Sequence, residues 1–318
     1  MSHGITETDQ MVYRNELPWH RLGIEFGGDP ETLKKLVFNY DVELRPINVG
    51  DITIPGKYAT WRNDFPNDDK GFLGIVGKDY TILQNSEMVD SFQELISKSE
   101  LVFETAGTLW GGKQSWVLAK LPMECYLNVP HQSGFYQDQI VPYVLIKNDF
   151  TGGKSITVTL TPVRVVCNNT LLMSLNRNMN NINIIHTANL QERIKQAFEI
   201  LNLKKSELKQ FMIDTQSFAE HSITKEEAKT YFEEVMYVEP DGKISTRKNN
   251  NLILLNNLYQ TGAGAEYSTG TLWGAYNAVT EYVDHFFAVR GKNQLERMNY
   301  TGAYKKQRAY EVALKMLS

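Results

Sequence analysis

The sequence has little of what identifies a secreted or membrane protein. Only two of its 318 residues are cysteines, Cys125 and Cys167, so no framework of disulfide bonds is implied. No run of about 18 apolar residues occurs, which a membrane-spanning helix would need. The first ten residues carry neither a basic segment nor an apolar segment of the kind that directs export. We therefore expect a cytoplasmic protein without contact to a membrane.

The chain also lacks the short motifs that identify many nucleotide-binding and metal-binding proteins. It contains no phosphate-binding loop, dinucleotide fingerprint, zinc-finger spacing or nucleophile elbow. The stretch Gly262-Ala263-Gly264-Ala265 lies between two predicted helices and does not follow a strand, so it predicts a turn between helices. No cofactor and no metal ion is expected, no catalytic residue is assigned, and an enzyme is the less favoured class.

Charge of one sign does not dominate. The sequence has 33 Lys and Arg against 37 Asp and Glu, a net charge of −4, so there is no overall attraction to nucleic acid. The part after residue 188 is slightly more basic than the part before it, but the difference is too small to mark a nucleic-acid-binding domain. Hydrophobic residues make up 42%, an ordinary value for a globular protein.

The hydrophobic pattern predicts an α+β fold, with a hairpin-rich antiparallel sheet domain and packed helices followed by a helical C-terminal domain. Expected boundaries are an N-terminal arm with a short helix over 1–40, the sheet domain over 41–187 and the helical domain over 188–318. The expected strands are 42–49, 58–62, 72–76, 80–83, 101–109, 114–121, 141–149 and 155–164. The expected helices are 31–38, one beginning at Ser86 after an Asn85 cap, one over 165–173, and most of the chain from 187 onward.

Two groups of residues are candidates for a polar site. In the helix predicted around 272–286, Asn277, Glu281 and His285 follow each other at intervals of four, which places them on one stripe. Cys167 is predicted at the start of a helix, where the helix dipole favours a thiolate. A hydrogen-bonded helix face and a buried cysteine are the alternative interpretations of these two patterns.

Several cations lie close to aromatic residues, as in surfaces that bind single-stranded nucleic acid. The candidate nucleic-acid-binding residues are Trp19, Arg21, Lys147, Lys154, Arg164, Arg177, Lys305, Lys306 and Arg308. Trp19 or Trp110 is expected to stack on bases. The alternatives are that Trp19 anchors the N-terminal arm and that the charged helix faces are simply solvated.

Three segments also resemble a known family. They are residues 18–23 (Pro-Trp-His-Arg-Leu-Gly), residues 164–171 (Arg-Val-Val-Cys-Asn-Asn-Thr-Leu) and the helix at 270–285. Together they resemble the phage/plasmid-like proteins of the domain of unknown function nine-three-two. The resemblance implies a mobile-element context, but it brings no activity that can be transferred to particular residues. The hairpin-rich sheet is also loosely similar to the core of single-strand annealing recombinases, which is an analogy of architecture alone.

Two main functional hypotheses follow. The first is a phage or plasmid accessory protein in the host cell cytosol that binds DNA in replication or recombination, annealing single strands as a homo-oligomer. The second is a protein-interaction factor that inhibits or redirects a host defence or replication enzyme. An enzyme built around Cys167, or around Glu281 with His285, comes third.

Overall fold

The computed structural model describes residues 6–15, 23–99, 101–123, 125–131, 134–164, 169–170, 181–203, 205–237, 245–287 and 302–318. The chain forms two compact units. The first comprises residues 1–122, 143–160 and 181–203, and the second comprises residues 123–142, 161–180 and 204–318. Both contain strands and helices, and the predicted α+β class with a helical C-terminal region is confirmed. The expected domain boundaries at residues 40 and 187 stay a prediction.

The first unit holds most of the strands. Its elements are β1 (Met11–Tyr13), β2 (Ile24–Glu25), α1 (Pro30–Val37), β3 (Val42–Val49), β4 (Ile52–Arg62), a short 3-10 turn (Asp69–Gly71), β5 (Phe72–Gly77), α2 (Asn85–Ser99), β6 (Val102–Leu109), β7 (Gln114–Lys120), β12 (Asn181–Ile184) and α4 (Leu190–Leu203). Two long strands, β9 (Gly134–Asp149) and β10 (Ile156–Arg164), give their residues 143–149 and 156–160 to this unit.

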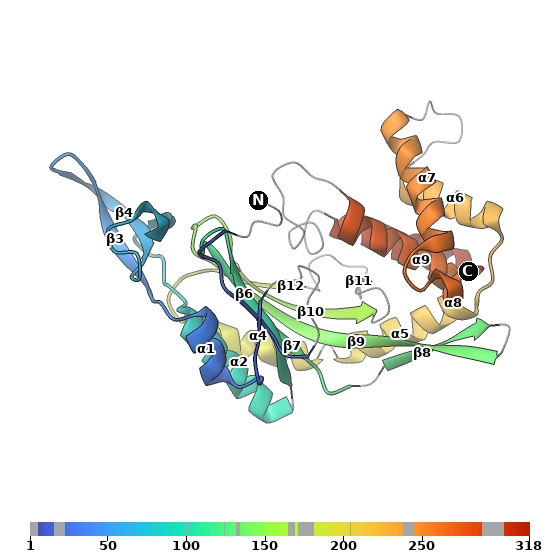
Figure 1. The fold of residues 1–318 in the computed structure, drawn as a ribbon, viewed down its shortest axis with the longest axis horizontal. Helices are drawn as coiled ribbons and strands as arrows, with labels where there is room; N and C mark the ends of the chain where they lie inside the picture. Colours follow the sequence, from blue (N-terminus) through green and yellow to red (C-terminus); the bar gives the residue numbers. More distant parts are fainter. Residues whose placement is uncertain are drawn as a thin grey trace. The chain divides into compact units, whose positions relative to one another are not determined.

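The smaller sheet of the first unit has three antiparallel strands, in the order β3-β4-β5. Its β3–β4 hairpin extends as an arm beyond the other elements of this unit (Figure 1). Gly50, with a φ of 59°, forms the turn at the tip, because glycine adopts the left-handed region without steric cost. At the base of the arm, Tyr40, Val42, Leu73 and Phe150 form a buried hydrophobic cluster.

The larger sheet has the order β11-β10-β9-β7-β6-β1-β2, with β8 paired to β9 and β12 paired to β10. Among the pairs whose register is described, β1 with β2 is parallel and the others are antiparallel. The expected hairpins with glycine turns are confirmed at 110–113, between β6 and β7, and at 150–155, between β9 and β10. The turns therefore bring Trp110 and Lys154 to the ends of neighbouring strands of one sheet.

The second unit is mostly helical. Its elements are β8 (Cys125–His131), β11 (Asn169–Thr170), α5 (Lys205–Glu220), α6 (Lys225–Val235), α7 (Thr246–Thr261), α8 (Ala265–Ser268), α9 (Leu272–Glu281), a π-helical turn (Tyr282–Phe286) and α11 (Ala303–Leu317), together with residues 134–142 of β9 and 161–164 of β10. Residues 272–280 are all buried, so α9 is enclosed on every side and forms the centre of this unit. The turn between helices predicted at 262–265 is confirmed.

Two predicted elements are wrong. Residues 80–83 form no strand, because their backbone makes isolated bonds such as the one from the Thr81 amide to the His186 carbonyl, 3.1 Å away. Asn169 and Thr170 lie in β11, paired with Val163 and Arg164, although a helix over 165–173 was expected. Pairing with an available strand overrides the preference of these residues for a helix cap. The remaining residues of that expected helix lie outside the described part of the chain.

Candidate nucleic-acid interface

Two aromatic rings lie side by side on one face of the small sheet. Trp61 of β4 and Phe72 of β5 are directly paired in the ladder, and their ring centroids are 6.0 Å apart. Phe72 is 37% exposed, and Ile75 on the same strand is 53% exposed. This face of the sheet therefore presents apolar and aromatic surface to solvent.

Cations lie over these rings and over a third one. Arg45 is 4.8 Å from the ring centroid of Trp61, and Lys113 is 6.0 Å from that of Phe72. The Lys154 Nζ is 5.5 Å from the ring centroid of Trp110. Distances up to about 6 Å allow a favourable cation–π interaction. We call these six residues, Arg45, Trp61, Phe72, Trp110, Lys113 and Lys154, the aromatic–basic band.

A cleft of about 490 Å³ opens in the band, lined by residues that include Phe72, Trp110 and Lys113. Acidic residues line it as well. The Glu7 carboxylate lies 2.7 Å from the Lys70 ammonium, and this hydrogen-bonded contact lowers the pKa of Glu7. Lys113 forms no ion pair with any residue in the described part of the chain, which leaves its charge available to a ligand.

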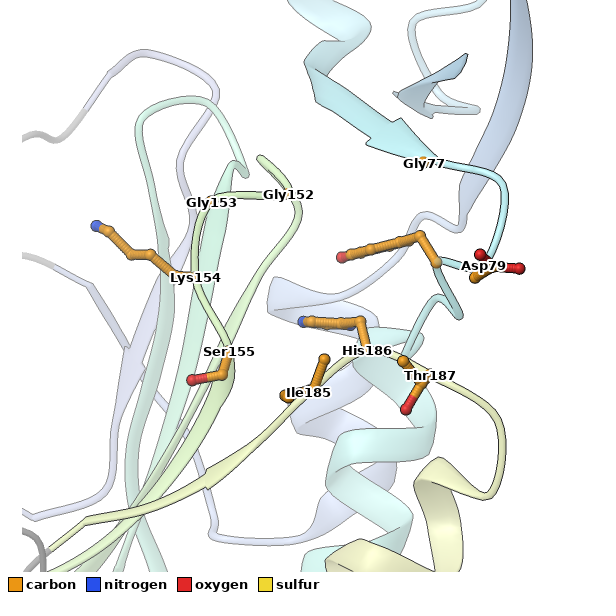
Figure 2. A pocket seen from close by; sticks show the side chains of 10 residues that line it. Gly77, Asp79, Gly152, Gly153, Lys154, Ser155, Ile185, His186 and Thr187 are labelled. Atoms are coloured by element: carbon orange, nitrogen blue, oxygen red, sulfur yellow. The ribbon is translucent and has the colours of Figure 1, made fainter. Parts of the chain in front are cut away.

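A second cleft, of about 350 Å³, lies beside the turn between β9 and β10 (Figure 2). Gly152 and Lys154 line it from the turn, and His186 lines it from the segment after β12. The His186 ring stacks on Tyr80 with centroids 4.5 Å apart, and burial lowers the pKa of His186. Figure 2 shows the Lys154 side chain directed away from His186. Lys154 therefore links this cleft to Trp110 and the rest of the band.

A buried arginine supports the band from below. Arg62 is 3% exposed, donates two hydrogen bonds to the Asp64 carboxylate at 3.0 and 2.7 Å, and lies 3.8 Å from the Tyr40 ring centroid. Burial raises the pKa of Tyr40 to about 12, so its hydroxyl is neutral at physiological pH. The positive charge of Arg62 is thus compensated by the Asp64 carboxylate, and Arg62 has a structural role.

Of the nine predicted nucleic-acid-binding residues, the structure places Lys154 in the band. Lys147 is half-buried near the C-terminal end of β9, opposite Trp116 of β7. Trp19, Arg21 and Arg177 lie outside the described residues, and of Arg164 the structure describes only the backbone in β10.

The three predicted cations of α11 differ in their exposure, and two of them are buried in the second unit. Lys306 is 2% exposed and forms an ion pair with Asp284, which is fully buried. Lys305 is 8% exposed and lies between the rings of Phe287 and Tyr304. Arg308 donates to the backbone carbonyl of Glu234, 2.9 Å away, and lies over Tyr237. These contacts give Lys305 and Lys306 internal roles, whereas Arg308 is half-buried beside Tyr237, which is 53% exposed.

The predicted polar stripe is interrupted. The helix changes from α-helical to π-helical geometry after Glu281, which shifts the register before His285. Asn277 is buried and donates to the Trp273 carbonyl, Glu281 is half-buried beside Ala263, and His285 is exposed. Cys167 lies outside the described residues.

Arg45, Trp61, Phe72 and Lys113 were missed as candidates. Alternation along β4 and β5 predicts that Trp61 and Phe72 point to one side of their strands, but the pairing register decides that they are neighbours. In the described part of the chain, no three His, Cys, Asp or Glu side chains gather where they would hold a metal ion. None of the described helices combines the length and the hydropathy needed to cross a membrane.

The fold and the band define an α+β protein with an exposed cation–aromatic surface on its strand-rich unit. A family model described as a domain of unknown function (DUF932) matches residues 72–303, and the chain belongs to this family. The matched range contains Phe72, Trp110, Lys113 and Lys154, whereas Arg45 and Trp61 precede it. Searches of curated proteins and of solved structures gave no match.

Proposed function

We propose that the protein binds single-stranded DNA through the aromatic–basic band, as an accessory factor of phage or plasmid replication or recombination. The observation that carries this proposal is the grouping of three rings, each with a cation beside it, on the first unit. Unpaired bases stack on exposed rings, and neighbouring cations contact the phosphates. Annealing of single strands by a homo-oligomer is the specific activity we infer.

The charges of the band set the kind of binding to expect. Arg45 in the band and Lys70 in the adjoining cleft have acidic partners, Glu43 and Glu7, so phosphates must compete with carboxylates for them. Only about two or three phosphates are then neutralised, and the affinity should depend weakly on salt. Most of the binding free energy comes from stacking, which contributes about 1–3 kcal/mol per base.

The test is fluorescence anisotropy with a labelled oligo-dT strand, the corresponding duplex and an abasic strand of equal length. We expect the highest affinity for oligo-dT and lower affinities for the abasic strand and the duplex. Phe72→Ser should weaken oligo-dT binding about tenfold or more, because one stacking surface is lost. Tyr126→Ser is the matched control, since Tyr126 is 41% exposed, close to the 37% of Phe72, but belongs to the second unit. Equal binding of oligo-dT and abasic strand would overturn the proposal.

A second candidate function is binding of a host defence or replication protein. The β3–β4 hairpin favours this function. Val49 and Ile52 beside the tip of the hairpin are 66% and 73% exposed, and exposed apolar groups on a projecting hairpin are suited to a protein partner. This function predicts saturable binding to a host protein and no salt-dependent affinity for oligonucleotides.

A further inference from the structure

Trp110 has an unusual backbone conformation for a residue of its size. Its φ is 55°, and Gly111 and Gly112 follow with φ values of 72° and 88°. Glycine adopts this left-handed region freely, whereas a residue with a Cβ is strained there. Such strain is retained where the surrounding structure imposes it, and it is concentrated at functional sites. A tryptophan in the first position of this turn therefore calls for an explanation that involves its ring.

The Asp9 carboxylate holds the turn from the N-terminal side. One oxygen accepts a hydrogen bond from the Gly111 amide at 3.0 Å, and the other accepts one from the Gly112 amide at 3.0 Å. The second oxygen also accepts from the Thr108 hydroxyl at 2.9 Å. Thr6 donates its amide and its hydroxyl to the first oxygen, at 2.7 and 2.9 Å, which fixes the carboxylate itself. Both oxygens are thus used to fix consecutive amides after Trp110.

Arg62 holds the same turn from the other side. Its Nη1 donates to the Gly111 carbonyl at 3.1 Å, so both backbone polar groups of Gly111 are bound. At Gly112 a Cβ would lie 2.6 Å from the Tyr40 hydroxyl and 3.0 Å from the Arg62 guanidinium, so no larger residue fits. The turn is consequently fixed by side chains from three separate segments, and it presents the half-buried Trp110 ring beside Lys154.

We propose that Asp9 is a positioning residue for DNA bases, which holds Trp110 as a preformed stacking surface. This inference rests on the proposed function of the band. A carboxylate near a DNA-binding surface repels phosphate, so electrostatics alone predicts that neutralising Asp9 strengthens binding. Positioning predicts the opposite, because the Asn amide group offers one acceptor in place of two and turns donors toward a backbone amide.

The experiment compares Asp9→Asn with Glu7→Gln. The second variant neutralises an acid that lines the cleft with Trp110 but bonds to Lys70 instead of to the turn. The probes are oligo-dT and abasic strands of about 12 nucleotides, within the usual site size of single-strand-binding surfaces. Asp9→Asn should lower oligo-dT affinity about tenfold and leave abasic affinity unchanged or slightly raised. Glu7→Gln should raise both affinities by up to about threefold, through the loss of one repulsive charge. Trp110→Gly should reproduce the Asp9→Asn loss, and the double variant should lose no more.

Two results would overturn the inference. One is a gain in affinity for both strands in Asp9→Asn, as in Glu7→Gln. The other is an equal loss for both strands, which indicates general loosening of the unit. Near-UV circular dichroism without DNA gives an independent readout: the Trp110 signal, obtained by subtracting the Trp110→Gly spectrum, should change in Asp9→Asn. If that signal changes but the wild type does not prefer oligo-dT, the proposed function fails while the control of Trp110 by Asp9 stands.

Discussion

The band on the first unit and the start of α11 in the second both place lysines against aromatic rings, but they differ in exposure. In the band, Phe72 is 37% exposed and Lys154 is exposed. In α11, Lys306 is 2% exposed and pairs with the fully buried Asp284. The proximity of cations and rings is therefore common to an internal support and to a candidate binding surface. Exposure distinguishes the two.

The sequence of α11 explains why Lys306 is buried. Lys306 precedes Ala309, Tyr310 and Ala313 by three, four and seven residues, and all three are buried. Residues at this spacing lie on one side of a helix, so Lys306 belongs to the apolar side. A lysine there is stable only with a compensating charge, which Asp284 supplies from the π-helical turn.

The largest expected effect is the loss of stability when this buried ion pair is broken. Lys306→Met should lower the free energy of unfolding by about 3–5 kcal/mol, because it leaves the Asp284 carboxylate buried without its cation. Urea-induced unfolding followed by circular dichroism measures the change. The affinity of the folded variant for oligo-dT should equal that of the wild type.

Lys315→Met provides the control for the buried pair. Lys315 lies on the same helix, but its side chain is 70% exposed and its ion pair with Glu234 spans 3.7 Å. Exposed pairs of this kind contribute at most about 1 kcal/mol, so the control should change stability little. Similar losses in the two variants would contradict the distinction between a buried and an exposed ion pair.

A smaller effect is expected for the exposed cation of the band. Lys113→Gln should weaken oligo-dT binding a few-fold and lower the slope of log affinity against log salt by about 1, because one phosphate contact is lost. Its stability should stay within about 0.5 kcal/mol of the wild type. An unchanged salt slope would place Lys113 outside the DNA-binding surface.

Much of the fold could be predicted from the sequence, and the failures have physical reasons. The strands β3 and β5 to β7 follow from alternating apolar residues bounded by glycine, and α1 follows from its capping residues. The segment at 80–83 has the composition of a strand, but its backbone groups bond to separate partners. Extension of β9 back to Gly134 and formation of β8 depend on mutual pairing, which local composition does not specify.

The candidate site was less accessible to prediction from sequence. Lys154 and Trp110 could be selected because a cation and a ring each stand in a glycine turn. Their proximity depends on strand order, and the pairing of Trp61 with Phe72 depends on register. Lys305 and Lys306 were selected for their charge although the apolar spacing of their helix already indicates burial.

The smallest expected effect is the pH-dependent stability contributed by a buried titratable group next to the band. His186 is 5% exposed, its Nδ1 lies 3.1 Å from the Thr81 carbonyl, and burial lowers its pKa below the value of about 6.5 in unfolded chains. The unfolded state therefore takes up this proton first as pH falls. Stability linked to neutral His186 is complete above about pH 6.5 and is lost as pH falls through the lower pKa of the folded state.

His186→Phe keeps a ring for stacking on Tyr80 but cannot titrate. At pH 8 the variant should be less stable by about 1 kcal/mol, the usual contribution of the lost hydrogen bond. The difference between wild type and variant should then narrow as pH falls from 7 to 5, because only the wild type loses the linked stability. Urea unfolding at each pH measures this difference in stability, with Lys306→Met as a reference for a buried charge outside this unit. A difference that stays constant with pH would mean that burial does not lower the pKa of His186 in the folded protein.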